Sequence, residues 1–97
     1  MATFISLVSW TEQGIKDFGS SADRADAANA LMGKHGGKLT HVWWTVGPYD
    51  LVVVSEFPDE QSAVAALLEL GALGNIRTTT LHAFDADQFR AIVAKTG

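Results

Sequence analysis

Four segments of the chain show the pattern of β-strands. Residues 3–10 alternate in the manner of a half-buried strand. Residues 38–46, 51–57 and 76–84 are dense in β-branched and aromatic residues, which favour strands. The turn-forming run Gly47-Pro48-Tyr49-Asp50 separates the second segment from the third, so these two strands are predicted to form an antiparallel hairpin.

Two segments between the strands space their apolar residues as helices do. The first extends from Ile15 to Met32, with Thr11 as its expected N-cap, and glycines together with Ser20-Ser21 predict a bend or break early in it. The second extends from Pro58, a favourable first helical residue, to Gly71, which is expected to stop it.

A shorter helix is predicted after the last strand. Asp85 with Gln88 resembles a capping box, and Phe89, Ile92 and Val93 follow as its apolar residues. A helix of about ten residues does not persist alone in water, so we expect it to dock on another surface.

The order strand–helix–strand–strand–helix–strand is the split βαβ pattern of the ferredoxin-like fold. Right-handed crossovers give an antiparallel sheet with the spatial order 4-1-3-2. We therefore predict a single α+β domain over residues 1–97, with a short C-terminal helix.

Parity divides the strand residues into two faces. One set is almost purely aliphatic and is expected to lie under the helices: Ile5, Leu7, Val42, Trp44, Val46, Val52, Val54, Leu81 and Ala83. The other set mixes apolar, hydroxyl and imidazole side chains: Phe4, Ser6, Val8, Trp10, Leu39, His41, Trp43, Thr45, Leu51, Val53, Ser55, Phe57, Ile76, Thr78, Thr80, His82 and Phe84. This second set is too apolar for a face that meets solvent.

Trp43 and Trp44 fall on opposite faces, and one layer of helices cannot shelter both rings. We therefore predict that a second copy of the chain packs on the mixed face, sheet against sheet. The polar groups of that face need hydrogen-bond partners, so we expect a cavity at the join, filled with water or with a ligand.

Composition narrows the class of protein. The chain has 97 residues, seven Lys and Arg against eleven Asp and Glu, a net charge of −4 and no cysteine. These features exclude disulfides and thiolate sites and argue against a nucleic-acid-binding surface. No stretch approaches the roughly 20 apolar residues of a membrane span, and the N-terminus lacks the basic start of a signal peptide. We expect a soluble, cytoplasmic protein with neither nucleic-acid nor membrane partners.

Several motifs together resemble the GYD domain family of small bacterial proteins. They are Trp10-Thr11-Glu12-Gln13-Gly14-Ile15, Gly36-Gly37-Lys38-Leu39, Gly47-Pro48-Tyr49-Asp50, and the run from Gly74 to Leu81 with Ala83-Phe84. The match extends from about residue 3 to about residue 95, and Gly47, Tyr49 and Asp50 supply the naming signature Gly-x-Tyr-Asp. The resemblance implies a ferredoxin-like fold of the dimeric α/β-barrel type. It implies no activity, and chemistry borrowed from the wider superfamily would rest on fold analogy alone.

Tyr49, Asp50 and His82 are the candidate catalytic residues. With the first and third strands parallel and the fourth antiparallel to them, these residues are expected about 10 Å apart at one end of the sheet, where they could transfer protons. The alternatives are a structural turn and a core histidine. The candidate ligand-binding residues are Phe4, His41, Trp43, Thr78, Thr80 and Phe84.

The sequence predicts no cofactor and no metal. His41 and His82 lie on opposite edge strands, roughly 14 Å apart, so only a site shared between subunits would join them. Arg77 is either a clamp for a carboxylate or phosphate or an ion-pairing surface residue.

The predicted function is that of a small homo-oligomeric module that binds a small organic ligand in an apolar-walled cavity. One alternative is a cofactor-free enzyme, monooxygenase-like or isomerase-like, that uses His82, Asp50 and Tyr49. Another is a structural assembly protein without a pocket. The expected partners are a second copy of the chain and the ligand.

Overall fold

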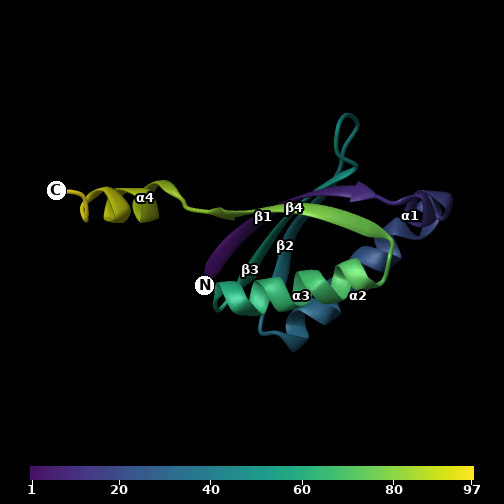
Figure 1. The fold of residues 1–97 in the computed structure, drawn as a ribbon, viewed down its shortest axis with the longest axis horizontal. Coiled ribbons are helices and arrows are strands. Elements are labelled where there is room, and N and C mark those ends of the chain that lie inside the picture. Colours follow the sequence, from purple (N-terminus) through teal and green to yellow (C-terminus); the bar gives the residue numbers. More distant parts are fainter.

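A four-stranded antiparallel sheet forms the frame of the computed structural model, which describes residues 1–97 (Figure 1). Its strands are β1 (Ala2–Trp10), β2 (Lys38–Trp44), β3 (Leu51–Phe57) and β4 (Ile76–Ala83), in the spatial order β2-β3-β1-β4. The α+β class, the ferredoxin-like topology and the strand order predicted from the sequence are confirmed.

The helices are α1 (Glu12–Lys16), α2 (Ser21–Lys34), α3 (Glu60–Ala72) and α4 (Ala86–Val93). A single 3-10 turn, Phe18–Ser20, separates α1 from α2, so the predicted break is confirmed. Helices α2 and α3 lie on one face of the sheet, whereas α4 follows β4 and projects away from the body (Figure 1). No helix is long and apolar enough to cross a membrane.

The helix ends follow the predicted capping residues with one difference. Thr11 caps α1 by accepting from the Gly14 amide, and Asp85 and Gln88 form a complete capping box on α4. Pro58 does not open α3, because Asp59 is the N-cap and accepts from the Ser62 amide at 2.8 Å. That hydrogen bond lowers the pKa of the Asp59 carboxyl below its usual value.

Helix α3 also continues past the predicted stop. Gly71 lies inside its last turn, and the helix ends at Ala72. The residue that redirects the chain is Gly74, whose φ of +87° is accessible to glycine at little steric cost.

The core lies between the sheet and helices α2 and α3. Phe57 is 1% exposed and Phe4 6%, and the two rings meet edge to face with their centroids 6.1 Å apart. On the helix side, Ala63 and Ala66 are 1% and 0% exposed. The small alanines leave room for the large rings of the sheet, so the two layers have complementary volumes.

This packing corrects the predicted assignment of the faces. On β1, β3 and β4 the mixed set faces the helices, because Phe4, Val8 and Val53 are buried there. Two hydroxyl groups of that face, those of Ser6 and Thr80, satisfy each other through a 2.9 Å hydrogen bond. The prediction that aliphatic residues would match alanine-rich helices was wrong on these strands.

Strand β2 behaves differently because its pairing with β3 is irregular between Leu39 and His41. This bulge shifts the parity of the strand, so Leu39 pairs with Ser55 of the helix-covered face, while Trp43 pairs with Val52 of the opposite face. Trp44 turns to the helix side, where its indole nitrogen donates to the Ser21 hydroxyl at 2.9 Å.

The face of the sheet opposite the helices, here called the open face, is aliphatic and aromatic at its centre and carries polar side chains toward its margins, among them Thr3, Glu56, Arg77 and Thr79. Trp43 is 51% exposed and Leu81 50% exposed. The pairing of the strands places five aliphatic residues and two aromatic ones together there: Ile5, Leu7, Val52, Val54, Leu81, His41 and Trp43.

Gly14→Ala tests the contact between α1 and the chain entering β4. An added Cβ would collide with the backbone oxygen of Asn75. We expect the free energy of unfolding to fall by about 1–3 kcal/mol, measured by urea denaturation.

The matched control is Gly33→Ala in α2, where an added Cβ meets nothing within 4 Å. It is expected to raise the free energy of unfolding by up to about 1 kcal/mol. Similar results for the two variants would contradict the close contact at Gly14.

Candidate functional site

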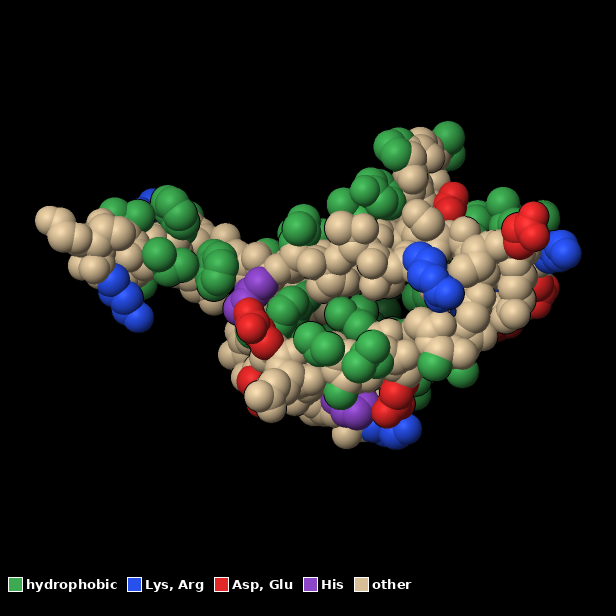
Figure 2. Space-filling view, in the orientation of Figure 1, with side chains coloured by type: hydrophobic (Ala, Val, Ile, Leu, Met, Phe, Trp, Pro, Cys, Tyr) green, Lys and Arg blue, Asp and Glu red, His purple; other side chains and the backbone are tan.

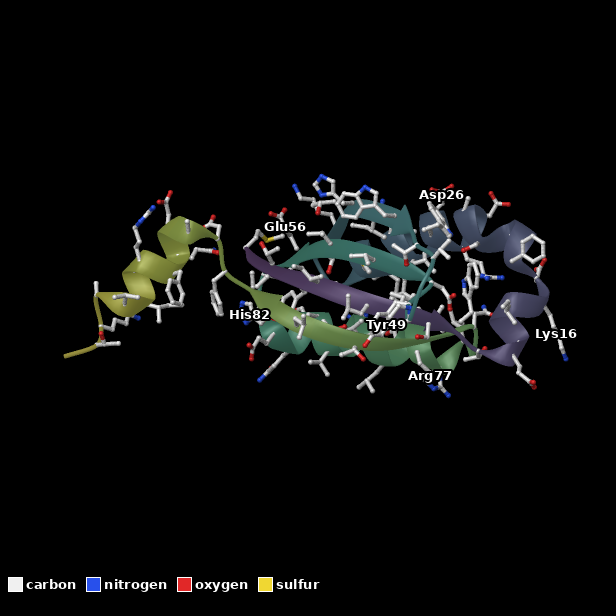
Figure 3. All side chains as sticks on the ribbon, turned by 90° about the horizontal axis from the view of Figure 1, so that it is seen from above. Lys16, Asp26, Tyr49, Glu56, Arg77 and His82 are labelled. Atoms are coloured by element: carbon white, nitrogen blue, oxygen red, sulfur yellow. The ribbon has the colours of Figure 1, made fainter.

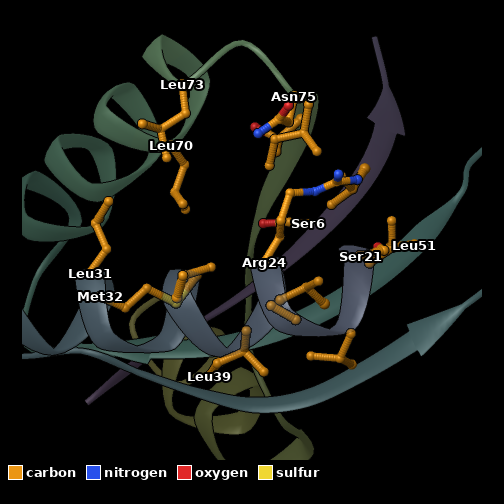
Figure 4. Close-up of a pocket in the computed structure, with 18 of the residues that line it drawn as sticks. Ser6, Ser21, Arg24, Leu31, Met32, Leu39, Leu51, Leu70, Leu73 and Asn75 are labelled. Carbon is orange, nitrogen blue, oxygen red and sulfur yellow. The ribbon is translucent and has the colours of Figure 1, made fainter. Parts of the chain in front are cut away.

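A cavity of about 270 Å³ lies between the sheet and helices α2 and α3 (Figure 4). It is lined by 20 residues, of which 15 are hydrophobic, and this apolar majority with a few polar groups is typical of small-molecule sites. The volume is just below the range of about 300–1,000 Å³ that is common for ligand pockets.

The cavity reaches the surface between α3 and β4. A shallower hollow on that side shares Leu67, Ile76 and Thr78 with the cavity wall. In the space-filling view, hydrophobic side chains surround a hollow between these two elements (Figure 2). This gap gives a molecule a route from solvent into the cavity.

The cavity exists because the sequence places small residues on the cavity side of α2. Ala25, Ala27 and Ala28 line it, and none of them reaches far enough to fill the space above the sheet.

At the C-terminal end of α2, His35 and the Glu69 carboxylate of α3 are 3.1 Å apart, which holds the helices together and lowers the pKa of Glu69. At this end of the cavity the helices are therefore tied to each other.

The location of the cavity differs from the sequence prediction. It lies on the helix-covered side of the sheet and not on the open face, because the faces were assigned the wrong way round. Of the candidate ligand-binding residues, Thr78 lines the cavity. Phe4 belongs to the core and Thr80 is bonded to Ser6.

The other candidates lie outside the cavity. His41 and Trp43 are on the open face, where their rings stack with centroids 5.1 Å apart. Phe84 follows β4 and stacks on His82 at 4.5 Å. No group of three or more His, Cys, Asp or Glu side chains is close enough to hold a metal ion.

The structure does not bring His82 together with Tyr49 and Asp50. Strand β1 is antiparallel to both β3 and β4, not parallel to β3 as the sequence argument assumed. Leu51, which follows Asp50, pairs with Val8 of β1, whereas His82 pairs with Phe4 of β1. Because Val8 and Phe4 are four residues apart, roughly 13 Å along the strand direction separates Leu51 from His82. Figure 3 shows Tyr49 and His82 at different positions along the sheet. The catalytic role of Tyr49, Asp50 and His82 remains a prediction, and His82 lies farther from the other two residues than the sequence led us to expect.

Asp50 and Tyr49 join the hairpin to β1. The Asp50 carboxylate accepts from the Trp10 amide at 2.8 Å, and the Asp50 amide donates to the Val8 carbonyl at 2.8 Å. The Tyr49 carbonyl accepts from the Thr45 hydroxyl at 2.6 Å. These contacts fit the structural-turn interpretation of the Gly-x-Tyr-Asp motif.

His82 lies at the other end of β4. Its Nδ1 is 2.7 Å from the Glu60 carboxylate in the first turn of α3. Its ring stacks between Phe4, at 4.8 Å, and Phe84, at 4.5 Å. His82 therefore connects the sheet, α3 and the segment leading to α4.

Sequence reasoning missed four of the five polar residues that line the cavity, namely Ser6, Ser21, Arg24 and Asn75. An arginine on a helix that also carries acidic residues is normally interpreted as a solvated charge, so the sequence did not indicate that Arg24 lines a cavity. The available signal was its position three residues after Ser21 and beside the alanines of α2, which places these groups on one helix face.

Comparisons with known proteins agree with this fold. The GYD domain matches residues 4–93. A Thermus thermophilus protein named "Glutamine synthetase and cystathionine beta-lyase binding protein" is 31% identical over 84 residues, which cover 86% of this chain and 88% of the relative. A crystal structure of a protein from the same organism has a TM-score of 0.57 at 24% identity, covering 89% of this chain and 96% of that chain.

Asp50→Ala tests the structural role of the turn. The substitution leaves the Trp10 amide without its charged acceptor, so we expect the free energy of unfolding to fall by about 1.5–3 kcal/mol. Tyr49→Phe is the control, because the contact of Tyr49 in this turn is made by its backbone carbonyl, and we expect a change within about 0.5 kcal/mol. Chemical denaturation measures both, and an unchanged stability for Asp50→Ala would refute the structural interpretation.

Proposed function

Since this chain belongs to the GYD domain family, we propose that it is a homo-oligomeric binding module that holds a small organic molecule between its sheet and its helices. The observation that carries the proposal is the cavity under α2 and α3, which is apolar, opens to solvent and combines hydrophobic walls with a few polar groups. Removing an apolar ligand from water supplies the driving force for binding.

The open face supports the homo-oligomeric part of the proposal. A sheet face with an apolar centre packs well against another such face, with the side chains of the two sheets interdigitating. This face is shared by every copy of the chain, so a two-fold pair buries it on both subunits at once. The aliphatic residues at the centre of this face, among them Ile5, Leu7 and Val54, form an apolar patch that is poorly suited to solvent.

Helix α4 supports the same conclusion. None of its residues is buried, although Phe89 is 59% exposed, Val93 49% and Ile92 39%. A helix of this length needs packing to be stable. It follows the edge strand β4 and projects away from the body (Figure 1), so its apolar residues are available to pack on a second copy.

A second candidate function is the binding of another protein. The named Thermus relative, by its printed name, binds glutamine synthetase and cystathionine beta-lyase. For this chain, the open face and α4 would be the surfaces available to a protein partner. The enzymatic alternative has less support, since its three residues do not converge.

Ala25→Leu tests the cavity as the binding site. The longer side chain occupies space that a ligand needs, so we expect the affinity for octanol to fall by at least about tenfold, measured by isothermal titration calorimetry. Ala30→Leu is the control on the exposed side of the same helix and should leave binding unchanged. Equal octanol affinities for the wild type and Ala25→Leu would place binding elsewhere.

Val54→Lys tests the open face as the subunit interface. Val54 pairs with Ile5 and His41 at the centre of this face, and a buried unpaired lysine disfavours association strongly. We expect an oligomeric wild type and a monomeric variant by sedimentation velocity at the same concentration. Leu68→Lys on α3, where Leu68 is 70% exposed, is the control and should remain oligomeric. A monomeric wild type at high micromolar concentration would overturn the proposed interface.

A further inference from the structure

The cavity contains one charged side chain, the guanidinium of Arg24, and no acidic residue. Arg24 is half-buried, and no carboxylate lies within 4.0 Å of it. Two of its nitrogens donate to the backbone carbonyls of Asp17 at 2.8 Å and Gly14 at 3.0 Å. These bonds fix the guanidinium at the cavity wall and leave donors free, while its charge remains unneutralised.

Two other hydrogen-bond donors lie at the same end. Ser21 is 7% exposed, and its oxygen accepts from the Trp44 indole, so its own hydroxyl hydrogen has no acceptor in the chain. The Asn75 side chain uses its oxygen to accept from Gln13 at 3.0 Å, which leaves its amide hydrogens free. Gly14, to which Arg24 is bonded, is packed directly against the backbone of Asn75.

The other end of the cavity has a different character. It is walled by Leu31, Met32, Leu39 and Leu70, which belong to or pack against the main hydrophobic cluster. Eleven positions of α2 separate Ser21 from Met32, a length of roughly 16 Å along the helix axis. In Figure 4, Arg24, Asn75 and Ser21 are set apart from Leu31, Met32 and Leu70 across the cavity.

From this polarity we infer that the ligand is an aliphatic monocarboxylic acid, bound with its carboxylate at Arg24 and its chain toward Met32 and Leu70. The inference rests on the proposed function, since it names the ligand class of that site. Arginine offers only donors, and so do the free groups of Ser21 and Asn75. A negatively charged acceptor can therefore accept hydrogen bonds from all three residues. A protonated amine would bring a second positive charge beside Arg24, and an alcohol leaves the arginine charge unneutralised.

Titration of the wild-type protein with octanoate, octanol and octylamine tests the inference. The three probes share one aliphatic chain and differ in the head group. We expect octanoate to bind about tenfold or more tightly than octanol, and octylamine to bind more weakly than octanol, by isothermal titration calorimetry at neutral pH. Equal affinities for octanoate and octanol would overturn the carboxylate assignment while leaving the cavity proposal intact. Failure of every probe to bind would overturn both.

Arg24→Met locates the preference within the cavity. It removes the charge while keeping an unbranched side chain of similar reach, so we expect the octanoate affinity to fall by about tenfold toward that of octanol, and the octanol affinity to stay within about threefold. Arg90→Met on α4 is the matched control, because Arg90 pairs with Asp87 far from the cavity, and it should retain the full preference. An unchanged octanoate preference in Arg24→Met would overturn the inference.

Arg24 also anchors the end of α1 through Gly14 and Asp17, so the variant is first checked for folding by circular dichroism. Arg24→Lys provides the second variant. Lysine keeps the positive charge but loses the forked geometry, so it should retain a preference for octanoate over octanol that is weaker than that of the wild type. Loss of the preference in both Arg24→Lys and Arg90→Met would contradict a specific role for Arg24.

Discussion

The packing of a sheet that carries large rings against helices that carry alanines is the interaction on which the rest of this structure depends. Ala63 and Ala66 bring α3 close to the sheet, and Phe4 and Phe57 fill the space between them. Only 13 of 97 residues are buried, and they lie in this layer or at its margin. A chain of this length has no second layer of helices, so one face of its sheet is covered and the other is not.

This asymmetry links the cavity to the open face. The alanines of α2 face sheet residues such as Ser6 and Val53, which are smaller than the rings of Phe4 and Phe57. The side chains on the two sides do not fill the space between them, and the unfilled volume is the cavity. On the opposite face, Leu7, Val54 and Trp43 meet no helix at all. The unfilled volume beside α2 is the proposed site for a small molecule, and the sheet face without helices is the proposed site for a second subunit. Both features arise because the chain has a single layer of helices.

The elements of the fold were predictable because their signals are local. Thr11, the Asp85–Gln88 capping box and the Gly47–Asp50 turn each act within a few residues, and strand order follows from general rules of chain crossing.

The assignment of faces was wrong because alternation defines two sets of residues but not which set the helices cover. The bulge at β2 then reversed the parity of one strand. The expected proximity of Asp50 and His82 was wrong because one strand direction was wrong, which places the two residues toward opposite ends of the sheet.

The polar end of the cavity shows why the proposed binding site could not be predicted from the sequence. The net charge of −4 argues against anionic partners for the surface as a whole, but a half-buried guanidinium acts over a short distance in a region of low dielectric. Arg24 is significant because no carboxylate pairs with it and because α1 holds it in place, and both are properties of the tertiary structure. In the proposed function, the ligand is therefore selected by the one charge that lines the cavity and not by the eleven acidic residues of the chain.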